Sequence, residues 1–358
     1  MKKLVVLLIC AVFFTFGCGK QNKEDIVNDL KNSINSSKAY KLTGTMEISN
    51  DEETFTYSIE SNYLKDNYYK VKLVNQTNNH EQIILRNNED VYVITPALNK
   101  SFKFQSDWPD NSSQAYLPKS IIKDIENDNN YELETNDNGY VVKTKVNYPN
   151  NNELKYQKIY LDNDKSLKKV EVYNNNDLVK IKVDFNEIDL KADLKADDFN
   201  IEEYIKEDDN AQNNTDNKTV DQKNVQNNEK CETDECSNKK TANIENIIYP
   251  LYIPSNTYLT SSEKIDTSTG NRVILTFSGE KNFVLIEEAS LKHDNMEVVP
   301  VYGEPLMMNE SVGALSSNSL SWDNGNISYY LASTELSSLE MQSIANSLGN
   351  NVLVAKTK

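Results

Sequence analysis

The four cysteines are the residues whose spacing points most directly to chemistry. Cys10 lies inside an N-terminal apolar run, and Cys18 follows that run. Cys231 and Cys236 enclose the four residues Glu-Thr-Asp-Glu. This pair forms either a local disulfide, which would constrain little of the unfolded chain, or two free thiols. With no further Cys and no His nearby the pair makes a poor zinc site, and we expect neither a metal nor a cofactor.

The N-terminus predicts where the protein resides. Two lysines precede an apolar run at residues 4–16, which has the length of a signal-peptide core and is too short for an ordinary membrane-spanning helix. The following Gly17-Cys18 resembles the bacterial lipobox, in which the thiol receives diacylglycerol before cleavage. Thr15 departs from the aliphatic residue usual in that box, and a signal peptide cut elsewhere or an uncleaved anchor are the alternatives. We expect residues 1–17 to be a lipoprotein signal peptide and a lipid on Cys18 to hold the protein on the outer face of the cell membrane.

The charge balance restricts the partners. The chain has 358 residues, a formal net charge of −17 and a pI near 4.7. Phosphate binding needs a basic surface, so nucleic acid is excluded as a partner. An anionic lipid surface is disfavoured for the same reason, which leaves membrane attachment to the lipid anchor.

No residue pattern in the sequence is typical of an enzyme. His80 and His293 lie in polar segments, and neither has a partner at the spacing of a zinc-binding helix. The ten glycines never cluster into a phosphate-binding loop. Glu287-Glu288 comes nearest to a catalytic pair, and such a pair is more often a solvated strand end. We therefore expect that the protein is not an enzyme.

A break in composition divides the chain into two domains. Between residues 206 and 243 the only branched aliphatic residues are Val220 and Val225. Such a segment cannot bury enough apolar surface to offset the entropy lost on folding. We expect a disordered acidic, Asn-rich linker at residues 206–243, between domains at 18–205 and 244–358.

The first domain combines a helix with many strands. Ile26, Val27, Leu30 and Ile34 recur at helical spacing, and Asn22 precedes them as a helix cap. Apolar and polar residues then alternate with the period of a strand, between turns rich in Asn and Asp. Strands are expected at 55–59, 69–73, 82–86, 91–94, 101–104, 140–146, 156–161, 167–173 and 178–185, and a short helix at 118–125. This order predicts a mainly β, α+β fold: a long antiparallel sheet with a few helices laid against it.

The second domain is expected to be a small α+β domain. Its strand-like runs are 272–277, 283–286, 297–301 and 327–331. A closing helix is marked by a capping box formed by Ser337 and Glu340. Its buried stripe is expected to be Met341, Ile344, Ala345 and Leu348.

Aromatic residues are frequent on the expected strands of the first domain. Tyr92, Phe102 and Phe104 are the examples around residue 100. Ordinary cross-strand packing accounts for such residues. The alternative is a curved sheet whose concave apolar face receives an acyl chain or a partner protein, with these three residues on the binding surface.

The helix that leads into Tyr-Lys-Leu-Thr-Gly-Thr-Met-Glu-Ile at residues 40–48, and the strand at 91–95 that ends in the Pro96 turn, resemble a known superfamily. This order is similar to the lipoprotein-carrier superfamily of LolA, LolB and the RseB N-terminal domain, over roughly residues 22–200. The resemblance implies an open antiparallel half-barrel capped by helices. Residues 96–109 resemble sporulation and germination lipoproteins of the GerS kind, in a longer, two-domain form. Residues 249–254 and 275–279 resemble the domain that follows the half-barrel in such proteins.

These observations predict an envelope binding or regulatory lipoprotein of a spore-forming Gram-positive bacterium. The resemblance implies an envelope protein partner, such as a cell-wall amidase that acts on the spore cortex. A Gram-positive cell has no outer membrane, so the carrier activity of the superfamily is not transferred. The alternative function is a binder of a hydrophobic acyl ligand in the half-barrel.

Overall fold

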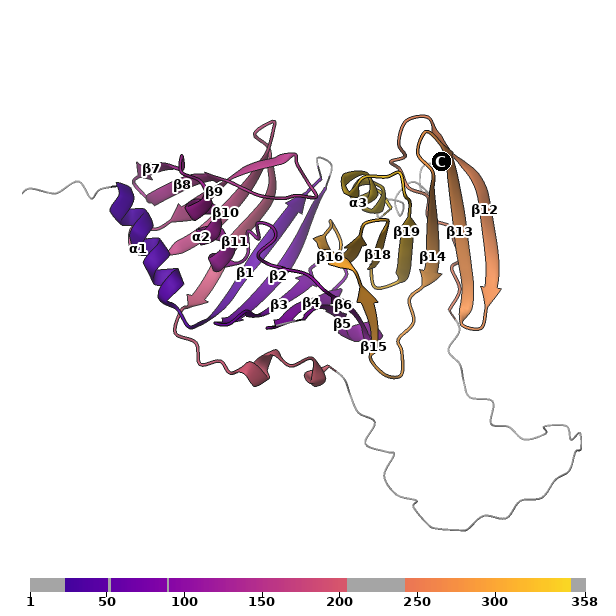
Figure 1. The fold of residues 1–358 in the computed structure, drawn as a ribbon, viewed down its shortest axis with the longest axis horizontal. Helices are drawn as coiled ribbons and strands as arrows, with labels where there is room; N and C mark the ends of the chain where they lie inside the picture. Colours follow the sequence, from indigo (N-terminus) through magenta and orange to yellow (C-terminus); the bar gives the residue numbers. More distant parts are fainter. Residues whose placement is uncertain (1–22, 51–52, 89, 205–241, 349–358) are drawn as a thin grey trace, which may run out of the picture.

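The computed structural model describes residues 23–50, 53–88, 90–204 and 242–348, which form two β-rich units (Figure 1). The large unit, residues 23–204, contains most of a 12-stranded sheet, and the small unit, residues 242–348, is built on a 7-stranded sheet. No helix within these ranges is long and apolar enough to cross a membrane. Residues 206–241 of the expected linker lie outside the described residues, so its disorder stays a prediction.

The large sheet is open and almost entirely antiparallel. Its strand order is β15-β6-β5-β4-β3-β2-β1-β11-β10-β9-β8-β7, and its end strands β15 and β7 are not neighbours. The strands are β1 (Ala39–Ser49), β2 (Thr54–Leu64), β3 (Tyr68–Asn75), β4 (Glu81–Asn87), β5 (Val91–Thr95), β6 (Lys100–Phe104), β7 (Glu132–Asn136), β8 (Gly139–Lys145), β9 (Leu154–Leu161), β10 (Leu167–Asn174), β11 (Val179–Asp189) and β15 (Glu297–Val301). The expected sheet is therefore confirmed, with β1 and β7 as strands that were not among those expected from the sequence.

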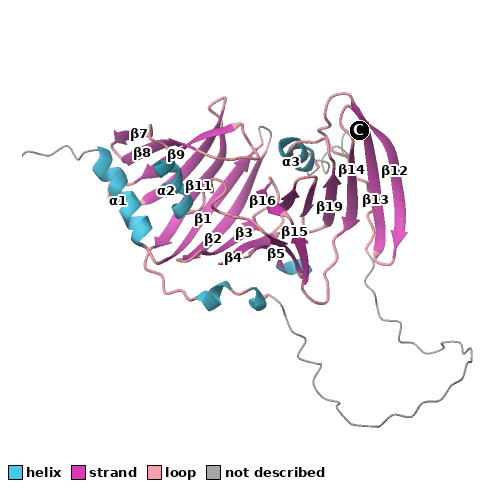
Figure 2. Cartoon of the chain, viewed as in Figure 1, coloured by secondary structure: helices cyan, strands magenta, loops and turns pink. Residues whose placement is uncertain are grey.

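Two helices cover one side of this sheet (Figure 2). They are α1 (Lys23–Ser36) and α2 (Pro118–Asn127), and short 3-10 turns lie at η2 (Pro96–Leu98), η3 (Ala196–Phe199) and η4 (Ile201–Glu203). The predicted stripe of α1 is confirmed, because Ile26, Val27, Leu30 and Ile34 are buried in one core with the inner face of the sheet. Asn22, the expected cap of α1, lies outside the described residues.

Strand alternation explains which side chains enter this core. In β2, Phe55, Tyr57 and Ile59 are buried, whereas their neighbours Thr56 and Ser58 are more exposed. Because successive side chains of a strand point to opposite faces, one face of β2 packs on the helices and the other meets solvent. The period read from the sequence is confirmed in this strand.

The small unit folds as a second antiparallel sheet with one helix. Its strand order is β12-β13-β14-β19-β18-β17-β16. The elements are β12 (Thr257–Thr267), β13 (Gly270–Gly279), β14 (Phe283–Ala289), β16 (Gly303–Met307), β17 (Val312–Ser316), β18 (Ser319–Asp323), β19 (Ile327–Ala332) and α3 (Ser338–Asn346). The capping box of α3 is confirmed: Ser337 Oγ accepts from Glu340 N, and Ser337 N donates to Glu340 Oε2 at 2.8 Å. The stripe from Met341 to Leu348 is also buried as predicted.

One strand of the second half belongs to the sheet of the first. The strand expected at residues 297–301 exists as β15, but it pairs in parallel with β6 and extends the large sheet. Two backbone hydrogen bonds join the segment that leads into β15 to the turn around Asn99. His293 N donates to Leu98 O at 2.9 Å, and Glu297 N donates to Asn99 O at 2.7 Å. The chain therefore crosses from the small unit to the large one and back again.

Candidate functional site

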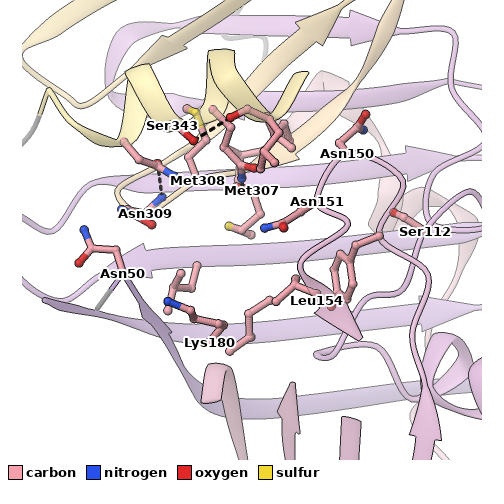
Figure 3. A pocket seen from close by; sticks show the side chains of 18 of the residues that line it. Asn50, Ser112, Asn150, Asn151, Leu154, Lys180, Met307, Met308, Asn309 and Ser343 are labelled. Carbon is pink, nitrogen blue, oxygen red and sulfur yellow. Dashed lines mark hydrogen bonds between the residues drawn. The ribbon is translucent and has the colours of Figure 1, made fainter. Parts of the chain in front are cut away.

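A pocket of about 640 Å³ lies between the two units and is the main candidate for a binding site (Figure 3). Ligand sites in proteins are usually concave, are often found where domains meet, and have volumes of roughly 300–1,000 Å³. Figure 3 shows Leu154 and Lys180 of the large unit on one side, and Met307, Met308 and Ser343 of the small unit on the other. The two units thus build the pocket together.

The large unit contributes an apolar patch to one wall of the pocket, among polar side chains such as Asn150 and Lys180. The patch is formed by Ile48 near the end of β1, Leu154 at the start of β9 and Ile181 near the start of β11. The phenol rings of Tyr116 and Tyr148 complete it. Burial raises the pKa of both phenols, so they stay neutral at any physiological pH.

On the side of the small unit, one mainly polar face of α3 lines the pocket, beside the apolar Met307 and Met308. Leu339, Gln342, Ser343 and Asn346 all line the pocket. Their spacing places them on one face of the helix, whereas Met341 and Ile344 point into the core of the small unit. One face of the helix therefore packs in the core of the small unit, and another face lines the pocket.

Hydrogen bonds between the units fix the shape of the pocket. Gln82 Nε2 donates to Val312 O at 3.1 Å, and Val312 N donates to Gln82 Oε1 at 2.6 Å. Tyr57 Oη donates to Asn309 O at 2.7 Å. The carboxylate of Glu304 accepts from the side-chain amides of Asn111 and Asn150. These bonds are buried or half-buried, so they hold the units in one relative position.

The lining of the pocket offers groups that can bind a ligand. Its lining contains no His or Cys. Across the described residues, no three His, Cys, Asp or Glu side chains come together as a metal site. The apolar patch, the amide-bearing helix face and the neutral phenols can enclose and hydrogen-bond a ligand.

Tyr92, Phe102 and Phe104, the residues expected on a binding surface, are buried in the structure. Their exposed fractions are 6%, 7% and 0%. Tyr92 pairs with Lys103, whereas Phe102 and Phe104 pair with Val93 and Val91, so Tyr92 points to the opposite face of the sheet. None of the three lines the pocket. Their role in binding a partner or ligand stays a prediction.

Val312 and Ala314 of β17 contribute to this burial, because they are buried in the same core as Phe102 and Phe104. The strand β15 lies beside β6 in the sheet and widens this face. Its Val299 and Val301 pair with Phe102 and Phe104 and pack against the same core. The sequence suggested a concave face left open for a ligand. In the structure this part of the face is closed by the chain itself.

The expectation that Glu287 is solvated is wrong. Its side chain is fully buried, and its Oε2 accepts a hydrogen bond from Ile248 N at 3.2 Å. Burial raises the pKa of Glu287 to about 7. Glu288 points to the other face, where Arg272 Nε lies 2.5 Å from its Oε1 at the protein surface. Successive side chains of β14 point to opposite faces of the sheet, so only one of the two carboxyl groups is buried.

Substitution of Glu287 by Gln is expected to stabilise the small unit in a pH-dependent way. Because the pKa of Glu287 is raised in the folded protein, the ionisation of this carboxyl does not destabilise the fold well below pH 4.5. The destabilisation grows as the pH rises through 7. Glu287→Gln should therefore raise the free energy of unfolding by about 2 to 3 kcal/mol at pH 8 and by much less at pH 5. Urea unfolding at both pH values measures this. Glu288→Gln is the matched control and should change little; an equal gain at both pH values would contradict the assignment.

The two histidines lie away from the pocket. His80 is buried between the units, with Nδ1 about 3 Å from where a side chain on Gly325 would begin, and burial lowers its pKa. His293 forms an exposed pair with Glu297, with Nε2 and Oε2 3.1 Å apart. Cys18, Cys231 and Cys236 lie outside the described residues, so the lipid attachment and the state of the thiol pair stay predictions.

The polar face of α3 is the part of the site that sequence reasoning missed. The helix carries one charged residue, Glu340, at its start. A helix face rich in Gln, Ser and Asn but without Lys or Glu is unusual for a face in contact with water alone. The absence of charge on this face was the sequence feature that could have indicated a contact surface.

The chain matches solved structures of bacterial protein complexes at low similarity. A chain of the Pseudomonas aeruginosa MucA/MucB complex matches 90% of this chain and 96% of its own length, at 14% identity and a TM-score of 0.28. A chain of the Clostridioides difficile CwlD amidase complex with the GerS lipoprotein matches 46% of this chain and 94% of its own length, at 15% identity and a TM-score of 0.28. Likeness at this level carries no argument about partner or ligand.

Sequence comparison gives a stronger result. The chain is 33% identical to "Sporulation protein YdcC" of Bacillus subtilis (strain 168) over 350 residues, and these residues make up 97% of each protein. The family model described as "Sporulation protein YdcC-like" matches residues 1–199. The predicted relation to sporulation proteins is confirmed, and the chain belongs to the YdcC-like family of sporulation proteins.

Proposed function

We propose that this protein is a sporulation-associated binding module of the cell envelope, held on the outer face of the membrane by a lipid on Cys18. The observation that carries the binding role is the pocket of about 640 Å³ built jointly by the two units. A pocket that exists only when both units are docked couples occupancy to their relative position. The module binds and positions its partner and performs no chemistry on it.

A protein partner suits the pocket best. Protein interfaces combine an apolar centre with polar groups around it, and this lining has Ile48, Leu154 and Ile181 on one wall and the amides of α3 on the other. The partner class suggested by the sequence resemblance is an envelope protein such as a cell-wall amidase. The net charge of −17 favours a partner with a neutral or basic contact surface.

The alternative occupant is an acyl chain. The apolar patch and the volume, which exceeds the roughly 300 Å³ of a small-molecule site, support it. Native mass spectrometry of protein extracted from membranes distinguishes the two, because an acyl ligand adds a discrete lipid mass to the folded chain.

A photo-crosslinking experiment tests the proposed site. A benzoylphenylalanine in place of Leu251, which lines the pocket and is 64% exposed, should form a discrete adduct in sporulating cells. The same probe in place of Tyr258 on β12, which is 67% exposed and does not line the pocket, is the matched control and should form none. Identical adducts from both positions, or none from Leu251, would rule out the pocket as the binding site.

A further inference from the structure

Two buried polar atoms at the pocket have no hydrogen-bond partner. They are Asn309 Nδ2, a donor, and Gln342 Oε1, an acceptor. Asn309 is only 5% exposed, and both residues line the pocket. Buried polar groups in native proteins are nearly always paired, so each unpaired group needs an explanation.

The rest of both residues is held firmly. Asn309 N donates to Asn346 Oδ1 at 3.0 Å, and Asn309 O accepts from Tyr57 Oη at 2.7 Å. Gln342 Nε2 donates to Met307 O at 2.9 Å. The backbone of Asn309 and the side chain of Gln342 are thereby fixed, and each side chain keeps one hydrogen-bonding atom without a partner.

An unpaired donor and an unpaired acceptor on residues that line one pocket match the two hydrogen-bonding groups of a peptide main chain. The C=O of a bound main chain would accept from Asn309 Nδ2, and an N–H would donate to Gln342 Oε1. The hydrocarbon part of an acyl chain has neither group and would leave both atoms unpaired inside the pocket, which is unfavourable. The apolar patch opposite, with Ile48, Leu154 and Ile181, suits the side chains of such a segment.

We propose that the pocket binds an extended apolar peptide segment of a partner protein, and that Asn309 and Gln342 recognise its main-chain amides. This inference rests on the proposed function and names the chemistry of the partner. Because Tyr57 of the large unit holds the backbone of Asn309, recognition requires the two units to be docked.

Three small probes of similar apolar size test the inference on the full chain. They are N-acetyl-Leu-Val-Leu N-methylamide, its analogue with an ester in place of the amide between Val and the second Leu, and decanoate. Isothermal titration should show that the wild type binds the tripeptide about tenfold more tightly than the ester analogue, and more tightly than decanoate. Asn309→Leu and Gln342→Met should each weaken tripeptide binding about tenfold. Gln342→Met should leave decanoate binding unchanged, because a carboxylate has no N–H to donate to Gln342 Oε1.

Ser338→Ala is the matched control on α3. Ser338 does not line the pocket, so tripeptide binding should not change. A melting curve of each variant checks that it is folded, and the ester comparison on the wild type remains decisive if a variant does not fold. Tripeptide binding that neither variant weakens, or tighter binding of decanoate, would overturn the inference while the pocket remains a binding site. If the wild type binds none of the three probes, the pocket itself loses its proposed function.

Discussion

Cys18→Ala protein will incorporate no radiolabelled palmitate during growth, whereas the wild type will be labelled. The thiol that follows the apolar run is the acceptor of the lipid in our proposal, and no other atom replaces it. Each buried methylene contributes about 0.8 kcal/mol to membrane attachment, so loss of two or three acyl chains removes firm anchoring. The variant should therefore leave the membrane fraction as well.

The control for this experiment is Cys10→Ala. Cys10 lies within the expected signal peptide, and its replacement keeps the run apolar, so labelling should persist. Equal labelling of the wild type and Cys18→Ala would end the anchoring hypothesis and favour a signal peptide cut elsewhere.

Phe104→Ala will lower the free energy of unfolding by about 3 to 5 kcal/mol, the usual range for removal of a buried aromatic side chain. Phe104 is fully buried, and its ring centroid lies 6.5 Å from that of Phe102. The substitution leaves a cavity between the sheet and the residues that cover it, because close-packed neighbours relax only in part.

Tyr258→Ala is the matched control, because Tyr258 is an aromatic strand residue that is 67% exposed. It should change stability by less than about 0.5 kcal/mol. Urea unfolding of both variants against the wild type gives the comparison. A Phe104→Ala protein as stable as the control would mean that this side chain is dispensable to the core and available for binding.

The sequence predicted those elements whose pattern is local. The stripe of α1 and the alternation of β2 both follow from the burial of one face, and the capping box of α3 depends on two residues three positions apart. The strand β12 escaped because nearly all its residues are exposed, so its apolar residues do not alternate. Short strands such as β17, which is buried on both faces, also lack alternation.

The site could not be predicted in the same way. Its walls come from segments as distant as Ile48 and Gln342, and no local pattern states that they meet. The placement of Tyr92 on the opposite face from Phe102 and Phe104 could not be predicted for a simpler reason. Residues on paired strands share a face only if their register agrees, and the register was not available from the sequence.

The pairing of β15 with β6 has a consequence for the order in which the chain can fold. The two strands are separated by about 200 residues, so their contact closes a very long loop and should form late. Until then the large unit presents β6 as an unpaired edge that can join another chain. A chaperone or foldase would therefore act on this protein in the interval between the folding of β6 and the arrival of β15.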